Sequence, residues 1–399
     1  MYELETTTLR LNSRDMFDPS HAAALSRLKT FIPKASAAYA AKRNYDDTTH
    51  VATLSPYIRH RIITEQDVLT ETLNQHSPQA AAKFIQEVFW RTYWKGWLEL
   101  RPSIWTAFRA ERDAALNRIQ TESGLRQRWE AACKGATGID GFDHWAQQLA
   151  ASGYLHNHAR MWFASIWIFT LQLPWTLGAD FFLRHLYDGD PASNTLSWRW
   201  VAGLQTKGKT YLADPENIAT YTHGRFRPTG LASHATPLEG APHPASGPAP
   251  ISDPIDPVLR TGLLITEEDL SPDWLLNRIA PVATATVQTT QHRSPLIVAP
   301  QVCDFVRDTI SDCTLRFGDR LGPVTTESSD TLGRWAETHD VQQIVTSYLP
   351  VGPTQDALRG LPLCQVIRSY DSAAWPHATH GYFRFRKQIP ALLDQLGAA

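Results

Sequence analysis

A proline-rich segment divides the chain into two halves that differ in pattern. Residues 228–257, PTGLASHATPLEGAPHPASGPAPISDPIDP, contain eight of the 26 prolines and show no apolar periodicity. Proline has a fixed φ and no amide hydrogen, so this stretch favours an extended linker over a helix or a central strand. We therefore expect two domains, residues 1–227 and 258–399, joined by a linker over residues 228–257.

The first half has helical patterns and few continuous strand patterns. Ser20 follows Asp18-Pro19 and suits a helix N-cap, after which Leu25, Leu28 and Phe31 fall on one face. Further helices are predicted over residues 79–100, 141–151 and 156–173. The domain is expected to be mainly α.

The second half alternates short β-prone runs with helical stretches. The β-prone runs cover residues 262–266, 282–287, 343–347 and 365–369, and the helical stretches cover residues 301–315 and 330–339. This alternation is typical of βα units. The fold class predicted for residues 258–399 is therefore a smaller α/β domain with a parallel sheet.

Composition excludes several classes of protein. The 38 basic and 40 acidic residues nearly balance, although residues 1–235 carry 26 basic and 22 acidic side chains. The four cysteines form no C-x-x-C pair, which argues against a zinc site, an iron–sulfur cluster or a disulfide scaffold, and no metal is predicted. The most apolar stretch, residues 161–175, is short of the roughly 20 residues that a bilayer needs. We expect a cytoplasmic monomer with no membrane partner.

One motif matches a phosphate-binding loop letter for letter. Residues 203–210, GLQTKGKT, fit G-x-x-x-x-G-K-[ST], which requires a preceding strand and a following long helix. Pro215 would interrupt that helix, and no later strand ends in a suitable aspartate. A nucleotide triphosphatase is therefore disfavoured.

Residues 79–100 carry charged and aromatic side chains on one face of the predicted helix. Phe84, Glu87, Trp90, Arg91 and Trp94 share this face by their spacing. An ordinary amphipathic helix would explain the aromatic residues alone. A carboxylate and a guanidinium among them are costly to bury, so the pattern favours a cavity with a polar ligand.

Two more clusters lie downstream, at residues 153–161 and 187–200. The second places Asp188 and Asp190 around Gly189 but lacks the further oxygen ligands of a calcium loop. With these blocks, residues 15–230 resemble the flavin-binding domain of the DNA photolyase and cryptochrome family. The resembling blocks are residues 54–57 (LSPY), 87–91 (E-x-x-W-R), 137–143 (T-G-x-x-x-x-D), 153–161 (G-x-x-H-N-x-x-R-M) and 188–200.

The resemblance implies FAD as the cofactor. Tyr39 and the turn at Leu54-Ser55 would hold the diphosphate side, Arg160 would pair with Asp188 beside the isoalloxazine, and Asn194 would face flavin N5. The implied cofactor-binding set is Tyr39, Thr53, Leu54, Ser55, Phe84, Arg91, Asn157, Arg160, Asp188, Gly189, Asp190 and Asn194.

The resemblance also implies light-driven repair of cyclobutane pyrimidine dimers in UV-damaged DNA. Trp90 would offer a π-face to a flipped base, and Glu87 would hydrogen-bond to it. The implied lesion- and DNA-binding set is Arg43, Glu87, Trp90, Arg91, Asn157, His158 and Met161. The implied catalytic set is Glu87, Asn157, Asn194 and the electron-transfer tryptophans Trp198 and Trp175. The alternative is a blue-light-sensing flavoprotein of cryptochrome type without repair activity.

Three differences from the family's usual sequence pattern bear on these expectations. Val51-Ala52 replaces Thr-Ser, which removes two hydroxyls from the phosphate site. His158 replaces a common arginine, and a surface or core histidine explains it equally well. No tryptophan lies at residues 119–126, where the distal electron-transfer member is expected; Trp129, Trp145 or Trp167 would have to substitute.

Parts of the second half resemble the family's antenna domain, which normally comes first. The resembling stretches are residues 266–272, 347–350 and 380–385. We hypothesise a swapped domain order with the antenna-like domain behind the flavin domain. The alternative is an unrelated α/β domain.

Overall fold

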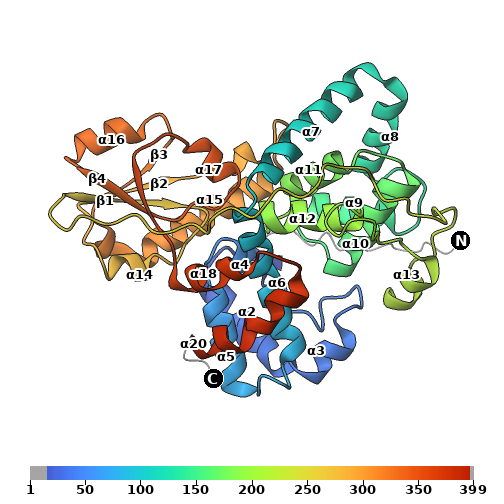
Figure 1. Ribbon diagram of the computed structural model, residues 1–399, viewed down its shortest axis with the longest axis horizontal. Coiled ribbons are helices and arrows are strands. Elements are labelled where there is room, and N and C mark those ends of the chain that lie inside the picture. The colour runs from blue at the N-terminus through green and yellow to red at the C-terminus, as the bar shows by residue number, and fades with distance from the viewer. Residues whose placement is uncertain (1–15, 396–399) are drawn as a thin grey trace, which may run out of the picture.

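The computed structural model describes residues 16–395 of the 399-residue chain, and its first half is a helical body (Figure 1). The predicted N-cap is confirmed, because the Ser20 hydroxyl accepts a hydrogen bond from the Ala23 amide. The helices of this half are α2 (His21–Phe31), α3 (Ala37–Lys42), α4 (Ser55–Arg59), α5 (Glu65–Gln75), α6 (Ala82–Glu99), α7 (Ser103–Thr121), α8 (Ser123–Lys134), α9 (Phe142–Ser152), α10 (Asn157–Ser165), α11 (Trp175–His185), α12 (Pro191–Val201) and α13 (Pro215–Tyr221).

The predicted boundary between α9 and α10 depends on one glycine. Gly153 has φ +67°, and a Cβ at this position would come within 2.8 Å of the Tyr187 ring. Only glycine adopts this positive φ easily and leaves room for the Tyr187 ring, so α9 ends here. After α10, a π-helical turn over Ile166–Thr170 extends the predicted helix.

The second half forms a five-stranded parallel sheet in the order β3-β2-β1-β4-β5. Its strands are β1 (Thr261–Thr266), β2 (Ala283–Val287), β3 (Val324–Glu327), β4 (Gln343–Ser347) and β5 (Leu363–Val366). Its helices include α14 (Asp273–Leu276), α15 (Pro300–Phe317), α16 (Leu332–Thr338) and α17 (Pro353–Ala357). The prediction of a mainly α first half and of a second half with a parallel α/β sheet is thus confirmed. Sequence reasoning missed β3, a short edge strand that alternates between exposed and half-buried residues.

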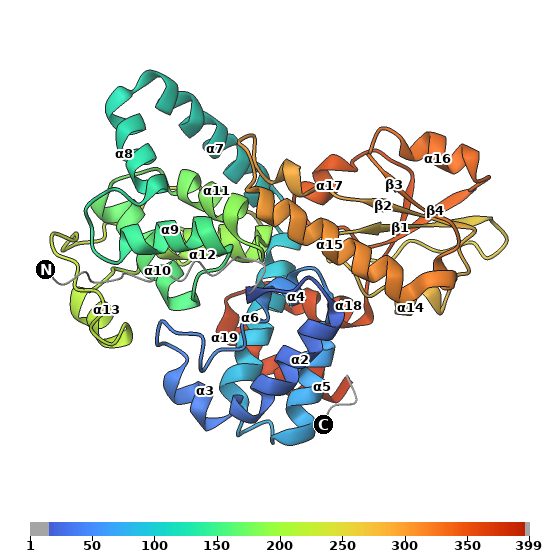
Figure 2. The same cartoon turned by 180° about the vertical axis from the view of Figure 1, so that it is seen from behind.

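Residues 369–395 fold back onto the helical body, although they follow the last strand. They form α18 (Ser369–Ala374), α19 (Tyr382–Phe385) and α20 (Ile389–Gln395), and both cartoon views place them beside α5 and α6 (Figures 1 and 2). Phe89 of α6 lies between Tyr370 and Phe385, at ring-centroid distances of 6.2 and 6.3 Å. The helical body is therefore built from both ends of the described chain.

The proline-rich segment has no helix or strand but lies along the surface of both halves (Figure 1). The Leu238 amide donates to the Ala202 carbonyl at 3.0 Å and the Gly247 amide to the Leu100 carbonyl at 2.8 Å. Near its end, the Asp253 amide donates to the Gln365 carbonyl of β5 at 2.8 Å. These bonds hold the segment at several points along its length.

Buried ion pairs join the helical body to the sheet. The order of the sheet reverses between β1 and β4, and open α/β sheets usually bind ligands beside such a point, at the carboxyl ends of the strands. Here Glu268, just after β1, forms two hydrogen bonds with the Arg59 guanidinium of α4 at 2.6 and 2.9 Å. The protein's own arginine thus lies where a ligand would be expected.

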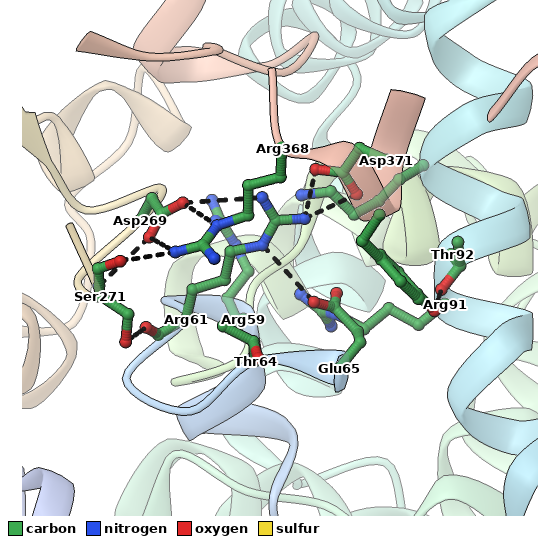
Figure 3. Close-up of polar contacts among 12 residues, drawn as sticks. Arg59, Arg61, Thr64, Glu65, Arg91, Thr92, Asp269, Ser271, Arg368 and Asp371 are labelled. Carbon is green, nitrogen blue, oxygen red and sulfur yellow. Dashed lines mark hydrogen bonds and ion pairs between the residues drawn. The ribbon is translucent and has the colours of Figure 1, made fainter. Parts of the chain in front are cut away.

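A neighbouring group of charges continues this interface (Figure 3). Arg61 donates to both oxygens of Asp371 at 2.8 and 2.6 Å, and Arg368 donates to both oxygens of Asp269 at 2.5 and 2.8 Å. Arg61 also lies 3.5 Å from Glu65. These charges are almost fully buried and mutually paired, which is the condition under which proteins tolerate buried charge. Within residues 16–395, no helix is long and apolar enough to cross a bilayer.

Candidate functional site

The charged and aromatic face of α6 forms one side of the candidate site. Glu87 forms an ion pair with Arg43, and both side chains are more than a quarter exposed. Burial raises the pKa of the Glu87 carboxyl, and the Arg43 charge opposes this shift. One turn earlier, Phe84 is buried against Tyr39, with the ring centroids 5.3 Å apart. The structure therefore brings together two pairs of predicted site residues that lie far apart in the sequence.

The block at residues 153–161 forms the start of α10. Arg160 donates through Nη2 to Asp188 at 2.9 Å and through Nε to the Leu155 carbonyl at 2.8 Å. The pairing predicted from the resemblance is present. Asn157 and Met161 lie on the same first two turns, where Asn157 is exposed and Met161 half-buried. His158 stacks on Trp162 with ring centroids 4.1 Å apart, and its Nδ1 lies 2.9 Å from the Asn44 carbonyl.

Residues 188–190 lead directly into α12. Asp190 is the N-cap, and its Oδ1 accepts from the Ser193 amide at 2.7 Å. Burial alone would raise the pKa of Asp190, but Arg91 at 3.3 Å, followed by Lys95 and Arg59, holds this pKa far below its usual value. Asp190 is therefore a permanent anion at the base of the site.

Asn194 and Gly189 are fixed by the same block. The Asn194 side-chain NH₂ donates to the Ala179 carbonyl at 2.8 Å, and no hydrogen bond among the described residues reaches its amide oxygen. A Cβ on Gly189 would lie 2.7 Å from Nη1 of Arg293 and close to two carbonyls. The backbone of this block therefore packs too closely for a side chain.

Arg91 and Asn157 belong to both predicted sets, and most of the remaining residues of the two sets differ in burial. Most of the predicted cofactor set is buried: Tyr39, Thr53, Leu54, Phe84, Asp188, Gly189, Asp190 and Asn194. Every residue of the predicted DNA set is half-buried or exposed: Arg43, Glu87, Trp90, Arg91, Asn157, His158 and Met161. An internal ligand on one side and a macromolecule on the other would require this division.

A cavity of about 370 Å³ opens beside the predicted phosphate turn. Arg27 and Lys34 line it, and neither has an ion-pair partner among residues 16–395, while Asp18 is its one carboxylate. Arg27 donates to the Thr53 hydroxyl at 2.5 Å, next to the Val51-Ala52 pair that lacks hydroxyls. The two cations and the surrounding hydroxyls suit an anionic ligand.

Several buried polar atoms near the site have no hydrogen-bond partner. They include Oδ1 of Asp188, Nε of Arg91 and Nε2 of His156. Buried polar atoms are rarely left unpaired in a folded protein. Nε of Arg91 lies 3.4 Å from a carboxylate oxygen of Glu65, so the Asp188 and His156 atoms are the better candidates for contact with a ligand.

The predicted electron-transfer tryptophans Trp198 and Trp175 are both buried on adjacent helices. Trp198 has edge-to-face contact with Trp167, with ring centroids 6.2 Å apart, whereas Trp145 stacks on Trp162 at 5.3 Å. Of the three substitutes considered for the distal position, Trp167 is therefore the one in ring contact with Trp198.

Sequence reasoning missed Arg27, Lys95 and Tyr382. Lys95 continues the α6 face one turn beyond Arg91, so its spacing could have revealed it. Arg27 and Tyr382 reach the site through contacts with Thr53 and Trp90, which no local spacing predicts. The disfavoured loop at residues 203–210 follows α12 rather than a strand, and the next helix, α13, begins at Pro215.

No group of three or more metal-binding side chains occurs within the described part of the chain.

Residues 84–224 match the family described as the FAD binding domain of DNA photolyase.

Parts of this chain are similar to three proteins named as photolyases. A deoxyribodipyrimidine photo-lyase of Alkalihalophilus pseudofirmus is 30% identical over 189 residues, which cover 47% of this chain and 39% of that protein. One of Streptomyces griseus is 33% identical over 165 residues, covering 41% and 34%. A class III photolyase structure from Agrobacterium tumefaciens is 28% identical with a TM-score of 0.45, covering 53% of this chain and 44% of that one. The chain thus spans less than half the length of these relatives. Residues 84–224 are thus similar to the FAD binding domain of DNA photolyase.

Proposed function

We propose that this chain is a light-driven, FAD-dependent DNA photolyase that repairs cyclobutane pyrimidine dimers. The observation that carries the proposal is the division of the site into a buried set around Asp188 and Asp190 and an exposed set around Glu87 and Trp90. A buried cofactor can transfer an electron to a base outside it only if the two share a wall. The shared wall would be α6, on which Phe84 is buried and Trp90 is half-buried.

The residues present fit FAD. The 370 Å³ cavity beside Thr53 carries the positive charge that a diphosphate needs, and Arg27 supplies donors where Val51-Ala52 has none. Asp188 keeps one oxygen free for a ligand hydroxyl or N–H group. The remaining contacts would come from the predicted cofactor set, including Asn157, Gly189, Asn194, Leu54 and Ser55.

Bound reduced FAD would supply, under blue light, the electron that splits the two cyclobutane bonds and then returns, so the repair involves no net oxidation. The protein's own groups hold the lesion. Glu87, with its raised pKa, would hydrogen-bond to a base edge, and Trp90 would stack on a flipped base. Arg43 would then exchange its partner Glu87 for a backbone phosphate.

The alternative is a cryptochrome-type light sensor that uses the same flavin site without repair. It is favoured by one observation: the Tyr382 ring already covers one face of Trp90, with ring centroids 3.5 Å apart and planes inclined by 12°. A flipped base could therefore stack only on the part of the Trp90 indole that Tyr382 leaves uncovered.

Illumination of the reduced protein with dimer-containing single-stranded DNA tests the proposal. Dimers lost only in the light support repair. A yellow protein that leaves the dimers intact supports the sensor, and a colourless protein contradicts both. The Glu87→Gln variant should repair at least about tenfold more slowly with an unchanged flavin spectrum, whereas Glu239→Gln, in the exposed linker, should repair at the normal rate. Normal repair by Glu87→Gln would contradict the assignment of the lesion pocket.

We also propose that residues 258–399 hold the antenna-like domain in a swapped order. Within this range, we take residues 258–366 as the antenna-like part, because residues 369–395 pack on α6.

A further inference from the structure

The segment of residues 380–388, HGYFRFRKQ, is attached to the same helix that carries Glu87 and Trp90. Tyr382 stacks on Trp90, and its hydroxyl donates to the Gln86 carbonyl at 2.7 Å. The Tyr93 hydroxyl donates to the His380 carbonyl at 2.8 Å, and Phe385 packs 5.5 Å from the Tyr93 ring. The 380–388 segment is therefore fixed beside the predicted lesion-binding face of α6.

The outward side of the segment alternates between aromatic and basic residues. Tyr382 and Phe385 are buried anchors, whereas Phe383 is 73% exposed and the Arg386 guanidinium lies 5.6 Å above its ring. Arg384 and Lys387 are also exposed. None of the three cations has an ion-pair partner among the described residues, and residues 377–393 contain no acidic side chain.

These features match one class of partner. Basic side chains that alternate with an exposed ring are typical of surfaces for unstacked nucleic acid, where the cations contact phosphates and the ring stacks on a base. A membrane surface would require an apolar helix face that is free to enter the lipid, but Tyr382, Phe385 and Ile389 of this helical stretch are buried. An acidic protein would use the cations but would leave the exposed Phe383 ring without a role.

We propose that the 380–388 segment is a second part of the DNA-binding surface, in which Arg384, Arg386 and Lys387 contact phosphates flanking the lesion and Phe383 stacks on a neighbouring base. This rests on the proposed function, because it takes Trp90 as the centre of the DNA site. Tyr382 is a positioning residue in this arrangement, since it fixes the plane of the Trp90 ring.

The test is the salt dependence of binding to a dimer-containing single-stranded oligonucleotide, measured by fluorescence anisotropy on the flavin-loaded protein. Each phosphate contact contributes about 0.7 to the slope of log K against log salt for single strands. The Arg384→Ala/Arg386→Ala/Lys387→Ala variant should therefore lose about 2 units of slope. Phe383→Ala should bind about 5- to 100-fold more weakly with an unchanged slope.

A charge-matched control separates local contacts from net charge. Arg278, Arg320 and Arg334 are exposed in the α/β region and have no ion-pair partner among residues 16–395. Their triple alanine variant should keep the wild-type slope. Equal slopes for the two triple variants would overturn the segment proposal and leave the proposed function intact, provided that the wild type binds the oligonucleotide. A wild type that carries FAD but binds no oligonucleotide would instead overturn the proposed function itself, and the segment proposal with it.

Discussion

Replacing Arg59 with methionine should destabilise the whole protein, because it removes one partner of a buried ion pair. The Arg59 side chain is 1% exposed and that of Glu268 is 4% exposed. Methionine retains most of the side-chain length. Among residues 16–395, it leaves the Glu268 carboxylate with the Thr354 hydroxyl at 2.8 Å as its hydrogen-bond partner and with the more distant charge of Lys95. Breaking a buried pair in this way costs about 3–5 kcal/mol.

The expected loss can be converted to a melting temperature. At about 2 cal/mol/K per residue, the unfolding entropy of 399 residues is about 0.8 kcal/mol/K. The melting temperature of Arg59→Met should therefore fall by about 4–6 °C. Thermal scans followed by circular dichroism, with urea unfolding followed by tryptophan fluorescence, measure this change.

An exposed pair is the matched control. Arg118 lies on α7 and pairs with Glu122, the residue that caps this helix. The two side chains are 55% and 47% exposed, so Arg118→Met should leave the melting temperature nearly unchanged. The double variant Arg59→Met/Glu268→Gln should recover part of the loss, since no uncompensated charge remains. A melting temperature of Arg59→Met within 1 °C of the control would refute the view that this pair joins the two halves.

Two further predictions concern the interface and the tryptophans. Burial raises the pKa of Glu99 to about 7, so between about pH 4.5 and 7 the folded protein keeps a proton that the unfolded chain loses. This contribution to stability is present below about pH 4.5 and is lost as the pH rises through 7. Glu99→Gln still accepts a hydrogen bond from the Val351 amide, and it should remove this part of the pH dependence of the unfolding free energy. Urea unfolding between about pH 5 and 7.5 measures this. If the unfolding free energy of the variant changes with pH as in the wild type, another group is responsible. A Cβ on Gly178 would clash with the Trp198 ring, so Gly178→Ala should displace that ring and slow photoreduction of the bound flavin. Chemical reduction of the flavin should still succeed. A normal rate of photoreduction would exclude Trp198 as the first electron donor.

The sequence allowed the elements to be predicted where the pattern is long or capped. The face of α6, the Ser20 cap and four of the five strands follow from periodicity and turn residues alone. β3 was missed because a four-residue edge strand without a buried face has no distinctive apolar pattern.

Contacts within the site were predictable only where the resemblance supplied them, as for Arg160 and Asp188. Pairs such as Arg27 with Thr53 and Tyr382 with Trp90 depend on how distant segments pack, and local spacing carries no information about such packing. The same holds for the arginine of α4 that fills the crevice of the sheet.

The return of residues 369–395 to α6 has a consequence for the order of folding. During synthesis, α5 and α6 leave the ribosome before any strand of the sheet exists, yet Phe89 and Tyr93 of α6 pack against Tyr370, Tyr382 and Phe385. The nascent helices must therefore keep an apolar face open while more than two hundred further residues are translated. A chaperone that binds such a face, or a transient association of the nascent helices with one another, would protect it until the last helices arrive.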